Sequence, residues 1–245
     1  MMALDNPFLA RLRAQTGLSS EEVAALRDIA ADPSIVISGR TLVTEGDPPR
    51  RLHILLEGWA ARVKWLPDGR RHLCAIVLPG DICDVDGLHL RAYDYGVVAL
   101  TACTIMTIDL PVLLALLDER SRVARALTWL AFVDNAILNE ASVSLGRRSA
   151  RERLAHFYCE IMLRLKAIGR SYDDGYRLPL TQETVGDALG LTAVHVNRTL
   201  RTLIEDGLLA IRERQVHVPE WKALQRAASF SPAYLHLDGM RRASA

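Results

Sequence analysis

Residues 180–209 read LTQETVGDALGLTAVHVNRTLRTLIEDGLL, and this pattern predicts two short helices joined by a tight turn. Thr181 and Thr192 are each placed to cap a helix, because a threonine oxygen accepts a hydrogen bond from a free N–H group of the first turn. Gly190 lets the chain leave the first helix with a positive φ angle, and Gly207 ends the second helix. The stretch is therefore expected to form a helix-turn-helix.

The second of these helices has an apolar and a polar face. The predicted inward stripe is Val196, Leu200 and Leu203. Arginine can bind guanine and asparagine adenine through paired hydrogen bonds, and an apolar side chain can pack on a thymine methyl group. We therefore expect Val194, Asn197 and Arg198 to read bases in a DNA major groove. The residues expected to contact the DNA backbone are Thr181, Thr192, Arg201 and Arg214. Such helix pairs also occur as plain packing units, which is the alternative interpretation.

The segment after the helix pair favours DNA binding. Leu209 and Ile211 alternate like one strand of a hairpin, and Val216 and Val218 like the other, which predicts the wing that accompanies such helix pairs. The turn at 212–215 lacks the Gly or Asn that a tight hairpin prefers. Its two arginines are placed to reach phosphate instead.

Composition limits the possible classes of function. A chain of 245 residues can hold two domains, and its formal net charge of +1 excludes a strongly basic DNA-coating protein. The stretch from Gly146 to Arg226 carries more Lys and Arg than Asp and Glu, which suits contact with DNA. The N-terminus has no apolar signal core, and no apolar run is long enough to span a membrane, so we expect a cytoplasmic protein without a membrane partner.

The four cysteines do not show the spacing of a metal site. They are Cys74, Cys83, Cys103 and Cys159. Buried, reduced thiols are expected, with no metal and no cofactor. The histidines at 53, 72 and 89 are interpreted as surface or hydrogen-bonded core residues rather than as ligands.

Between Ser34 and Asp109 the sequence predicts short strands separated by Gly and Pro. The expected strands are Ile35–Ile37, Thr41–Thr44, Leu52–Leu56, Ala60–Trp65, His72–Val77, Gly96–Thr101 and Thr104–Ile108. Their number and spacing favour a small antiparallel barrel or roll. No set of residues in this region indicates a catalytic centre, so an enzyme is not expected.

A long helical stretch is predicted from Pro111 to about Gly146. Apolar and small residues recur in it at alternating spacings of four and three, a heptad pattern that can pair two copies of the chain. This expected dimer seam is Val123, Leu127, Leu130, Asp134, Ile137, Ala141 and Ser144. The alternative is a helix packed on its own barrel, with Trp129 and Phe132 lying off the seam and available for that packing. Asp134 departs from the apolar pattern and is expected to set the register or to face a cavity.

Helix caps predict the remaining boundaries. Ser19 with Glu22, and Ser149 with Glu152, form capping boxes that start helices ending near Ile29 and Ile168. The stretch 169–176 is expected to be a loop. A short helix at 220–228 and a tail containing the basic pair 241–242 are expected to end the chain.

This order of elements resembles the Crp–Fnr family of bacterial transcription regulators. The marks of the resemblance are TEGD (44–47), LEGWA (56–60), PDGR (67–70), LPGD (78–81), Thr-Ala-Cys (101–103), GRRSARERLAHFY (146–158) and the helix pair, and they cover roughly residues 35–218. The resemblance implies an α+β fold with three parts. These are an N-terminal antiparallel β-roll like a cyclic-nucleotide-binding domain, a long dimerisation helix and a C-terminal winged helix-turn-helix. The expected bounds are 1–110, 111–146 and 147–245.

The resemblance also implies roles for individual residues. The recognition positions fall on Ala193, Val194, Asn197 and Arg198, and Arg198 matches the family's guanine-reading arginine. Val194 replaces the family's base-reading glutamate, so the usual operator sequence is not carried over. The implied partners are double-stranded DNA, a second copy of the chain, and RNA polymerase if the protein is an activator.

The effector positions depart from the family pattern. Val85 stands where cyclic-AMP binders carry a glutamate, and Tyr93 and Asp94 stand in place of an Arg-Ser pair. The adenine-contacting positions of the long helix fall on Leu138 and Asn139. The oxygen-sensing branch requires an N-terminal cysteine cluster, which this sequence lacks. We therefore predict a homodimeric DNA-binding regulator with an unassigned input signal. The alternative is a ligand-binding regulatory module whose winged domain contacts only protein.

Overall fold

The computed structural model of the chain describes residues 6–172 and 174–240. It forms two compact units. One comprises the chain up to Lys64, Ala75–Asn135 and the chain from His236; the other comprises Trp65–Cys74 and Ala136–Leu235. The boundary between the units falls within the long helical stretch, after Asn135.

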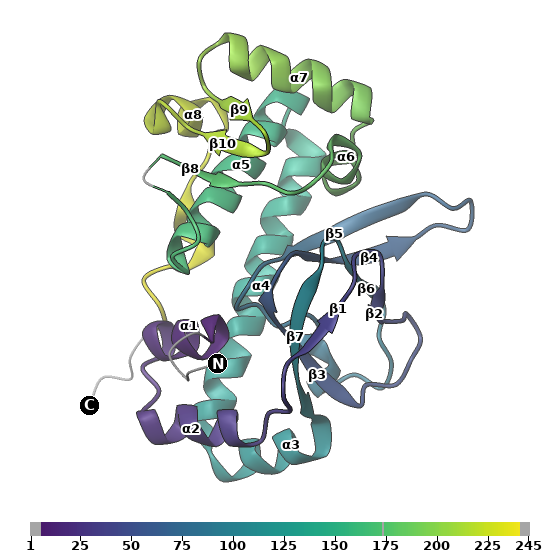
Figure 1. Cartoon of the computed structure of the whole chain (residues 1–245), viewed down its shortest axis with the longest axis vertical. Coiled ribbons are helices and arrows are strands. Elements are labelled where there is room, and N and C mark those ends of the chain that lie inside the picture. Colours follow the sequence, from purple (N-terminus) through teal and green to yellow (C-terminus); the bar gives the residue numbers. More distant parts are fainter. Residues whose placement is uncertain (1–5, 173, 241–245) are drawn as a thin grey trace. The chain divides into compact units, whose positions relative to one another are not determined.

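The first unit is built on two antiparallel sheets (Figure 1). One has the strand order β1-β7-β3, with bounds Ser34–Val36, Cys103–Asp109 and Arg51–Glu57. The other has the order β2-β6-β4-β5, with bounds Thr41–Val43, Gly96–Ala99, Ala60–Trp65 and Arg71–Val77. Alternate apolar residues of these strands, including Val43, Leu55 and Ile105, form a buried core. Each strand expected in this region is confirmed, with small shifts at the ends.

Two N-terminal helices pack on this roll: α1 (Pro7–Thr16) and α2 (Ser20–Asp28). The predicted capping box is confirmed, because the Ser19 side chain accepts from the Glu22 N–H at 3.2 Å and the Glu22 carboxylate accepts from the Ser19 N–H at 2.7 Å. Leu12 of α1 and Leu26 of α2 lie in a core cluster with residues of the roll.

The long helical stretch is two helices, α3 (Leu110–Glu119) and α4 (Ser121–Arg147). They are separated by Arg120, whose φ of −122° and ψ of 79° are not helical. The expectation of one helix from Pro111 was therefore wrong at this residue.

The predicted dimer seam is also wrong in its N-terminal half. Val123, Leu127 and Leu130 are 0%, 1% and 7% exposed and belong to the core cluster of the roll. A residue already buried in its own chain cannot form the contact surface for a second copy. Phe132, which the alternative interpretation made available for packing on the roll, is 67% exposed. Ile137, Ala141 and Ser144, the rest of the predicted seam, lie beyond this cluster, with Ile137 and Ser144 buried.

The second unit contains α5 (Ala150–Ala167), α6 (Gln182–Leu189), α7 (Ala193–Glu205) and α8 (Trp221–Ala227). The predicted capping box of Ser149 and Glu152 starts α5. The stretch expected to be a loop contains a strand, β8 (Gly175–Arg177), which pairs with β10 (Gln215–His217), itself paired with β9 (Ala210–Arg212). A Cβ on Gly175 would lie 2.2 Å from the Val216 carbonyl oxygen, so the absence of a side chain permits this pairing.

Short segments complete the two units. The 3₁₀ turns η1 (Val85–Leu88) and η2 (Pro232–Leu235) lie in the first and second units. The chain from His236 returns to the first unit, where the Met240 N–H donates to the Gln15 carbonyl at 2.7 Å. The basic pair at 241–242 lies outside the described residues. Among the described helices, none combines the length and apolar character needed to cross a membrane.

Candidate nucleic-acid interface

The helix pair begins at the two predicted threonine caps. The Thr181 Oγ1 accepts from the Thr184 N–H at 3.1 Å, and the Thr192 Oγ1 accepts from the His195 N–H at 3.2 Å. Gly190 has a φ of 63° at the end of α6, as the sequence predicted. These local interactions fix where α7 begins and therefore which residues it presents outward.

Gly186 of α6 permits the close approach of the turn. A Cβ at this position would lie 2.4 Å from the Leu191 carbonyl oxygen, a distance that no side chain can occupy. Sequence reasoning did not single out Gly186. A glycine within a helix costs about 1 kcal/mol of stability relative to alanine. Its presence in a predicted helix was therefore the sequence feature that indicated a tight packing contact.

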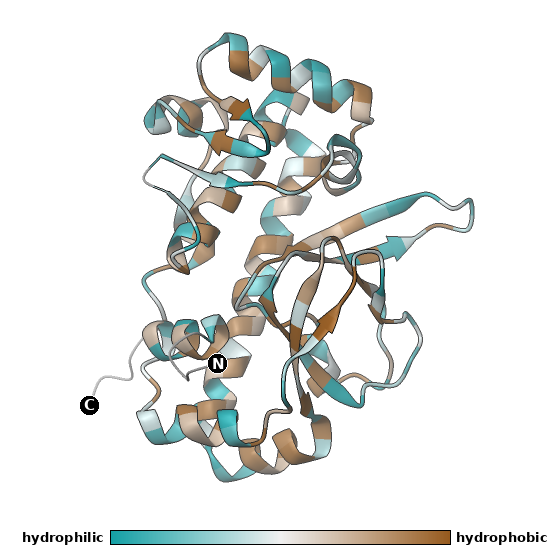
Figure 2. Cartoon of the chain, in the orientation of Figure 1, coloured by the Kyte–Doolittle hydropathy of each residue, from teal (hydrophilic) through white to brown (hydrophobic). Residues whose placement is uncertain are grey.

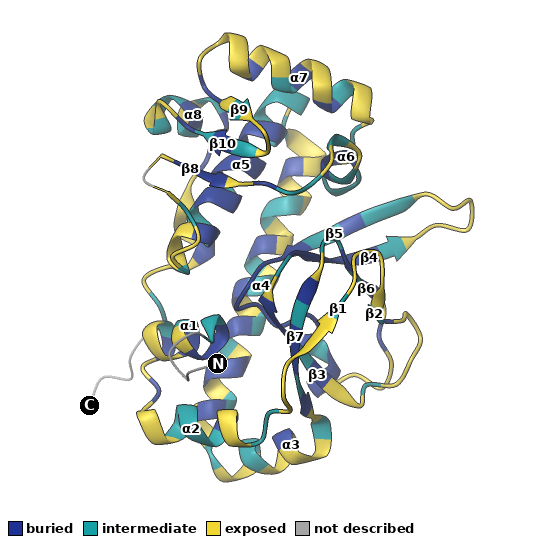
Figure 3. Ribbon diagram, in the orientation of Figure 1, coloured by how far each residue is buried: buried dark blue, intermediate teal, exposed yellow. Residues whose placement is uncertain are grey.

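The outward face of α7 is exposed to solvent (Figure 3). Val194 is 80% exposed, and Asn197 and Arg198 are exposed beside it, whereas Val196 and Leu203 are buried. Figure 2 shows polar and apolar residues alternating along this helix. The face carries all three predicted base-reading residues together.

The two arginines of this face are available for intermolecular contacts. The guanidinium groups of Arg198 and Arg201 make no hydrogen bond or ion pair with residues in the described ranges, and both residues are exposed. An arginine held by an internal carboxylate would have to break that pair before binding DNA. Neither residue has this cost.

Asn197 is oriented by a residue that the sequence analysis missed. Its Nδ2 donates to the Gln182 Oε1 at 3.0 Å, which links α7 to the first residue of α6. Among the described residues, the second N–H of the Asn197 amide and its Oδ1 have no partner, and these are the donor and acceptor that a paired contact with adenine uses. Gln182 thus holds Asn197 in a usable orientation.

The wing turn is tight and strained. Arg212 pairs with Gln215, which leaves Glu213 and Arg214 as a two-residue turn with φ angles of 50° and 66°. Glycine and asparagine adopt such angles readily, and other L-residues do so at a cost. The turn at 212–215 lacks the Gly or Asn that favours this conformation, and the chain nevertheless forms the tight turn. Strain of this kind is kept where the side chains are needed for function.

Arg214→Gly is expected to stabilise the fold and to weaken DNA binding. Relief of the positive φ should raise the free energy of unfolding by about 1 kcal/mol, while loss of a phosphate contact should weaken binding to all sequences and reduce the salt dependence. Chemical denaturation and DNA titrations over a range of salt concentrations measure both effects. Glu213→Gly is the matched control, because it relieves similar strain but removes a negative charge and should not weaken binding. An unchanged salt dependence in Arg214→Gly would contradict the phosphate contact.

Arg153 of α5 joins three helices within the second unit. Its Nη1 donates to the Leu189 carbonyl at 2.6 Å, and its Nη2 donates to the carbonyls of Leu145 at 3.2 Å and Arg148 at 3.3 Å. The guanidinium thereby satisfies free carbonyl groups at the ends of α4 and α6. Nothing in the sequence distinguishes this arginine from a solvent-exposed one.

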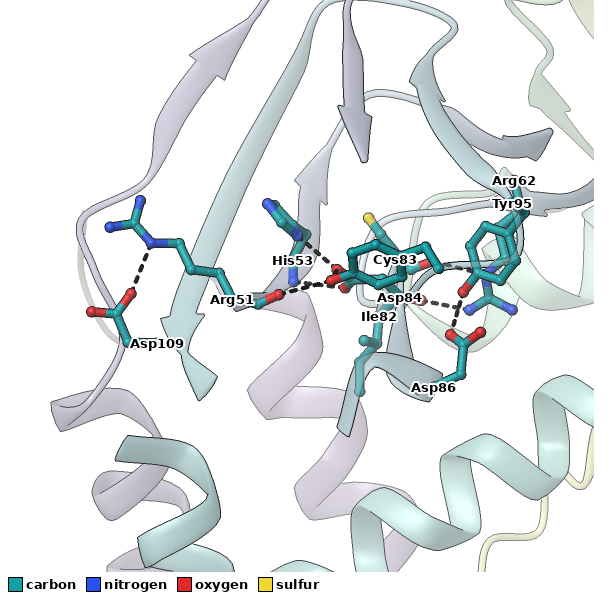
Figure 4. A network of polar contacts seen from close by, with 10 residues as sticks. Arg51, His53, Arg62, Ile82, Cys83, Asp84, Asp86, Tyr95 and Asp109 are labelled. Carbon is teal, nitrogen blue, oxygen red and sulfur yellow. Dashed lines mark hydrogen bonds and ion pairs between the residues drawn. The ribbon is translucent and has the colours of Figure 1, made fainter. Parts of the chain in front are cut away.

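In the first unit, two of the three aligned effector positions are occupied by buried side chains, and the third, Asp94, is exposed. Val85 and Tyr93 are buried, and the Tyr93 hydroxyl donates to the Asp84 carboxylate at 2.9 Å. Asp84 is fully buried and also accepts from the His53 backbone N–H at 2.8 Å, while its second oxygen lies 2.7 Å from the His53 Nδ1 (Figure 4). Burial and then the charge of Asp84 raise the pKa of Tyr93. A fixed negative charge therefore lies inside the roll.

A cavity of about 620 Å³ opens beside this network. Its lining includes Arg50 and Arg51 and also two acids, Asp47 and Asp109. Arg51 is already paired with Asp109 at 2.7 Å. The positive charge of the lining is therefore largely balanced, and the cavity does not have the excess of cations that a phosphate requires.

Three of the four cysteines have the environment of structural thiols, and Cys74 is half-buried. Cys83, Cys103 and Cys159 are buried, and burial raises the pKa of each, to about 12 for Cys159. Thiols with raised pKa values are poor nucleophiles and poor metal ligands at neutral pH. Within the described ranges, no group of three or more His, Cys, Asp or Glu residues is arranged to hold a metal ion.

Both units match known protein families. Residues 36–120 match the model of the cyclic nucleotide-binding domain, and residues 152–227 match that of the Crp-like helix-turn-helix domain. The nitrogen fixation regulation protein FixK of Bradyrhizobium diazoefficiens is 33% identical over 175 residues, which cover 71% of this chain and 72% of FixK. The transcriptional activator protein FnrL of Cereibacter sphaeroides is 29% identical over 85% of both chains.

The fold agrees with a solved relative. The structure of FixK2 from Bradyrhizobium japonicum superposes with a TM-score of 0.75 at 25% sequence identity, covering 82% of this chain and 98% of FixK2. The β-roll, the long helix and the winged helix pair thus occur together, in this order, in a protein of the same type. The chain therefore belongs to the Crp–Fnr family and is a sequence-specific, DNA-binding transcription regulator of the kind that acts as a homodimer.

Proposed function

We propose that the chain is a cytoplasmic regulator that binds a two-fold symmetric operator as a homodimer, with α7 of each copy in a major groove. The observation that carries this proposal is the exposed face of α7, where Val194 and Asn197 lie together with Arg198, whose guanidinium is unpaired among the described residues. Arg198 reads guanine, Asn197 reads adenine, and Val194 packs on a thymine methyl group. The residues proposed to contact the DNA backbone are Thr181, Thr192, Arg201 and Arg214.

The dimer forms through an exposed stripe on α4 in place of the seam first predicted. Exposed residues recur along this helix at spacings of four and three, and Phe132 is the large apolar residue among them. We name this set the exposed stripe: Thr128, Phe132, Asn135, Asn139 and Ser142. A heptad of this kind presents one continuous face to a second helix, and Phe132 supplies the apolar anchor.

RNA polymerase is the proposed protein partner if the regulator activates transcription, as the relative FnrL, a transcriptional activator protein, does. The wing and α7 are assigned to DNA, so a polymerase contact requires another surface.

Selection of bound sequences from a random DNA pool tests the proposal. The expected product is a palindromic sequence with half-sites about one helical turn apart, bound more tightly than random DNA at each salt concentration. Enrichment of no sequence, or equal affinity for selected and random DNA, would contradict operator recognition and favour a winged domain that contacts only protein.

Cyclic AMP is not expected to control this regulator. Val85 has no hydrogen-bonding group for the ribose, and no arginine stands at the aligned phosphate position, where Tyr93 is buried on Asp84. Asp94, at the second aligned position, would add a carboxylate beside the phosphate, and two such charges about 4 Å apart repel by about 1–4 kcal/mol, depending on the local dielectric. Calorimetry with millimolar cyclic AMP or cyclic GMP should therefore detect no binding. Micromolar binding that also tightens operator affinity would contradict this prediction.

A further inference from the structure

Arg62 of β4 is a charged residue buried inside the first unit, with a side chain only 8% exposed. Its Nε donates to the Cys83 carbonyl at 2.7 Å, and its Nη2 donates to the Ile82 carbonyl at 2.9 Å and to the Asp134 carboxylate at 2.7 Å. The guanidinium also lies 5.5 Å from the centre of the Tyr95 ring. One side chain thus connects β4, the 82–83 segment and helix α4.

The ion pair is not explained by stability alone. Burial alone would lower the pKa of Arg62, but the charge and hydrogen bond of Asp134 together with the electrostatic effects of Tyr95 and Asp86 outweigh burial, so the pKa is raised and the arginine stays charged. Replacing a buried ion pair by well-packed apolar residues is often neutral or stabilising, because both charges lose their hydration. Apolar contacts permit a helix to slide or rotate, whereas the fork of an arginine accepts one arrangement. The ion pair of Arg62 and Asp134 therefore specifies the position of α4 on the roll.

The 82–86 segment is held from its other side as well. Figure 4 shows Arg62 and His53 approaching this segment from opposite sides, with His53 bonded to Asp84. The Tyr95 hydroxyl donates to the Asp86 carboxylate. Arg62 therefore bonds α4 to a segment that is itself fixed within the roll by the chain's own side chains.

We propose that Arg62 and Asp134 are a positioning pair, which fixes α4 on the roll and keeps its exposed stripe ready to form the DNA-binding dimer without a small-molecule effector. This inference rests on the proposed homodimer, because it acts through α4. Asp134 lies between Phe132 and Asn135 of the stripe, so a change in its position alters the dimerising face directly. The helix is unbroken from Ser121 to Arg147, so Asp134 and the exposed stripe belong to one continuous helix.

The test separates affinity from stability in two variants. Arg62→Met combined with Asp134→Leu removes both charges and should keep a melting temperature near that of the wild type, while operator affinity falls about tenfold or more. Asp134→Asn leaves an oxygen acceptor for Arg62 but an unneutralised buried charge. It should be less stable than the double variant and yet bind the operator more tightly.

The exposed pair Arg51 and Asp109 provides the control. Its two side chains are each 60% exposed and lie 2.7 Å apart, so Arg51→Met with Asp109→Leu should leave operator affinity unchanged. If the buried double variant does not fold, Arg62→Lys replaces it. A lysine keeps the charge but lacks the fork, so operator affinity should still fall, about fivefold or more.

Two results would overturn the inference. One is a folded double variant, or a folded Arg62→Lys variant in its place, with operator affinity within about twofold of the wild type. The other is an operator affinity that rises and falls with melting temperature across all variants. This result would indicate that the pair of Arg62 and Asp134 only stabilises the fold. Failure of the wild type to bind a selected operator would instead overturn the proposed function, and the inference with it.

Discussion

Phe132→Arg is expected to convert the dimer into monomers and to abolish operator binding. Phe132 is 67% exposed in the single chain, and the exposed stripe places it opposite a symmetry-related copy of itself or its near neighbours. The substitution removes the apolar burial of two phenylalanines, about 4 kcal/mol in all, and brings two positive charges together. A loss of about 4 kcal/mol weakens dimerisation about a thousandfold, which sedimentation at micromolar protein concentration detects.

Two substitutions control for this result. Phe132→Leu keeps an apolar anchor and should remain a dimer. Val112→Arg places a charge on an exposed apolar residue of α3, outside the stripe, and should also remain a dimer. A Phe132→Arg variant that sediments as a dimer and binds the operator normally would exclude the exposed stripe as the interface.

The error in the predicted seam comes from the limits of helix periodicity. Periodicity indicates that one side of a helix is apolar, but it does not say whether the chain's own roll or a second copy covers that side. Val123, Leu127 and Leu130 satisfy a heptad pattern and face the roll. An arginine at Leu130 would disrupt the core of the first unit, so it would report on folding rather than on dimerisation.

The correctly predicted parts depend on local interactions. A capping box needs only residues three positions apart, so the starts of α2 and α5 follow directly from Ser19 and Ser149. The helix pair follows from its caps and from Gly190 in the same way. Strand positions in the roll follow from alternation between Gly and Pro turns.

The missed residues act over long sequence distances. Gln182 orients Asn197 from fifteen positions away, and Arg62 reaches Asp134 across seventy-two. A single sequence contains no sign of such pairs. Asp134 did break the apolar pattern of α4, which predicted an exceptional role, but its partner became evident only in the folded roll.

Arg198→Ala is expected to cost about 1–3 kcal/mol in each half-site and therefore about 2–6 kcal/mol for the symmetric operator. A loss of about 2 kcal/mol for the whole operator already weakens binding about thirtyfold. The guanidinium has no internal hydrogen bond or ion pair with the described residues, so its removal should leave the melting temperature almost unchanged. The preference for guanine at one position of each half-site should relax, while the salt dependence stays close to that of the wild type.

Arg201→Ala is the matched control one helical turn away. Arg201 is also exposed and is proposed to hold phosphate, so its loss should weaken binding to selected and random DNA alike and flatten the salt dependence. The two variants thus distinguish base reading from backbone contact on a single helix. An equal loss of affinity for selected and random DNA in Arg198→Ala would show that Arg198 contacts only phosphate, and base reading would then rest on Asn197 and Val194.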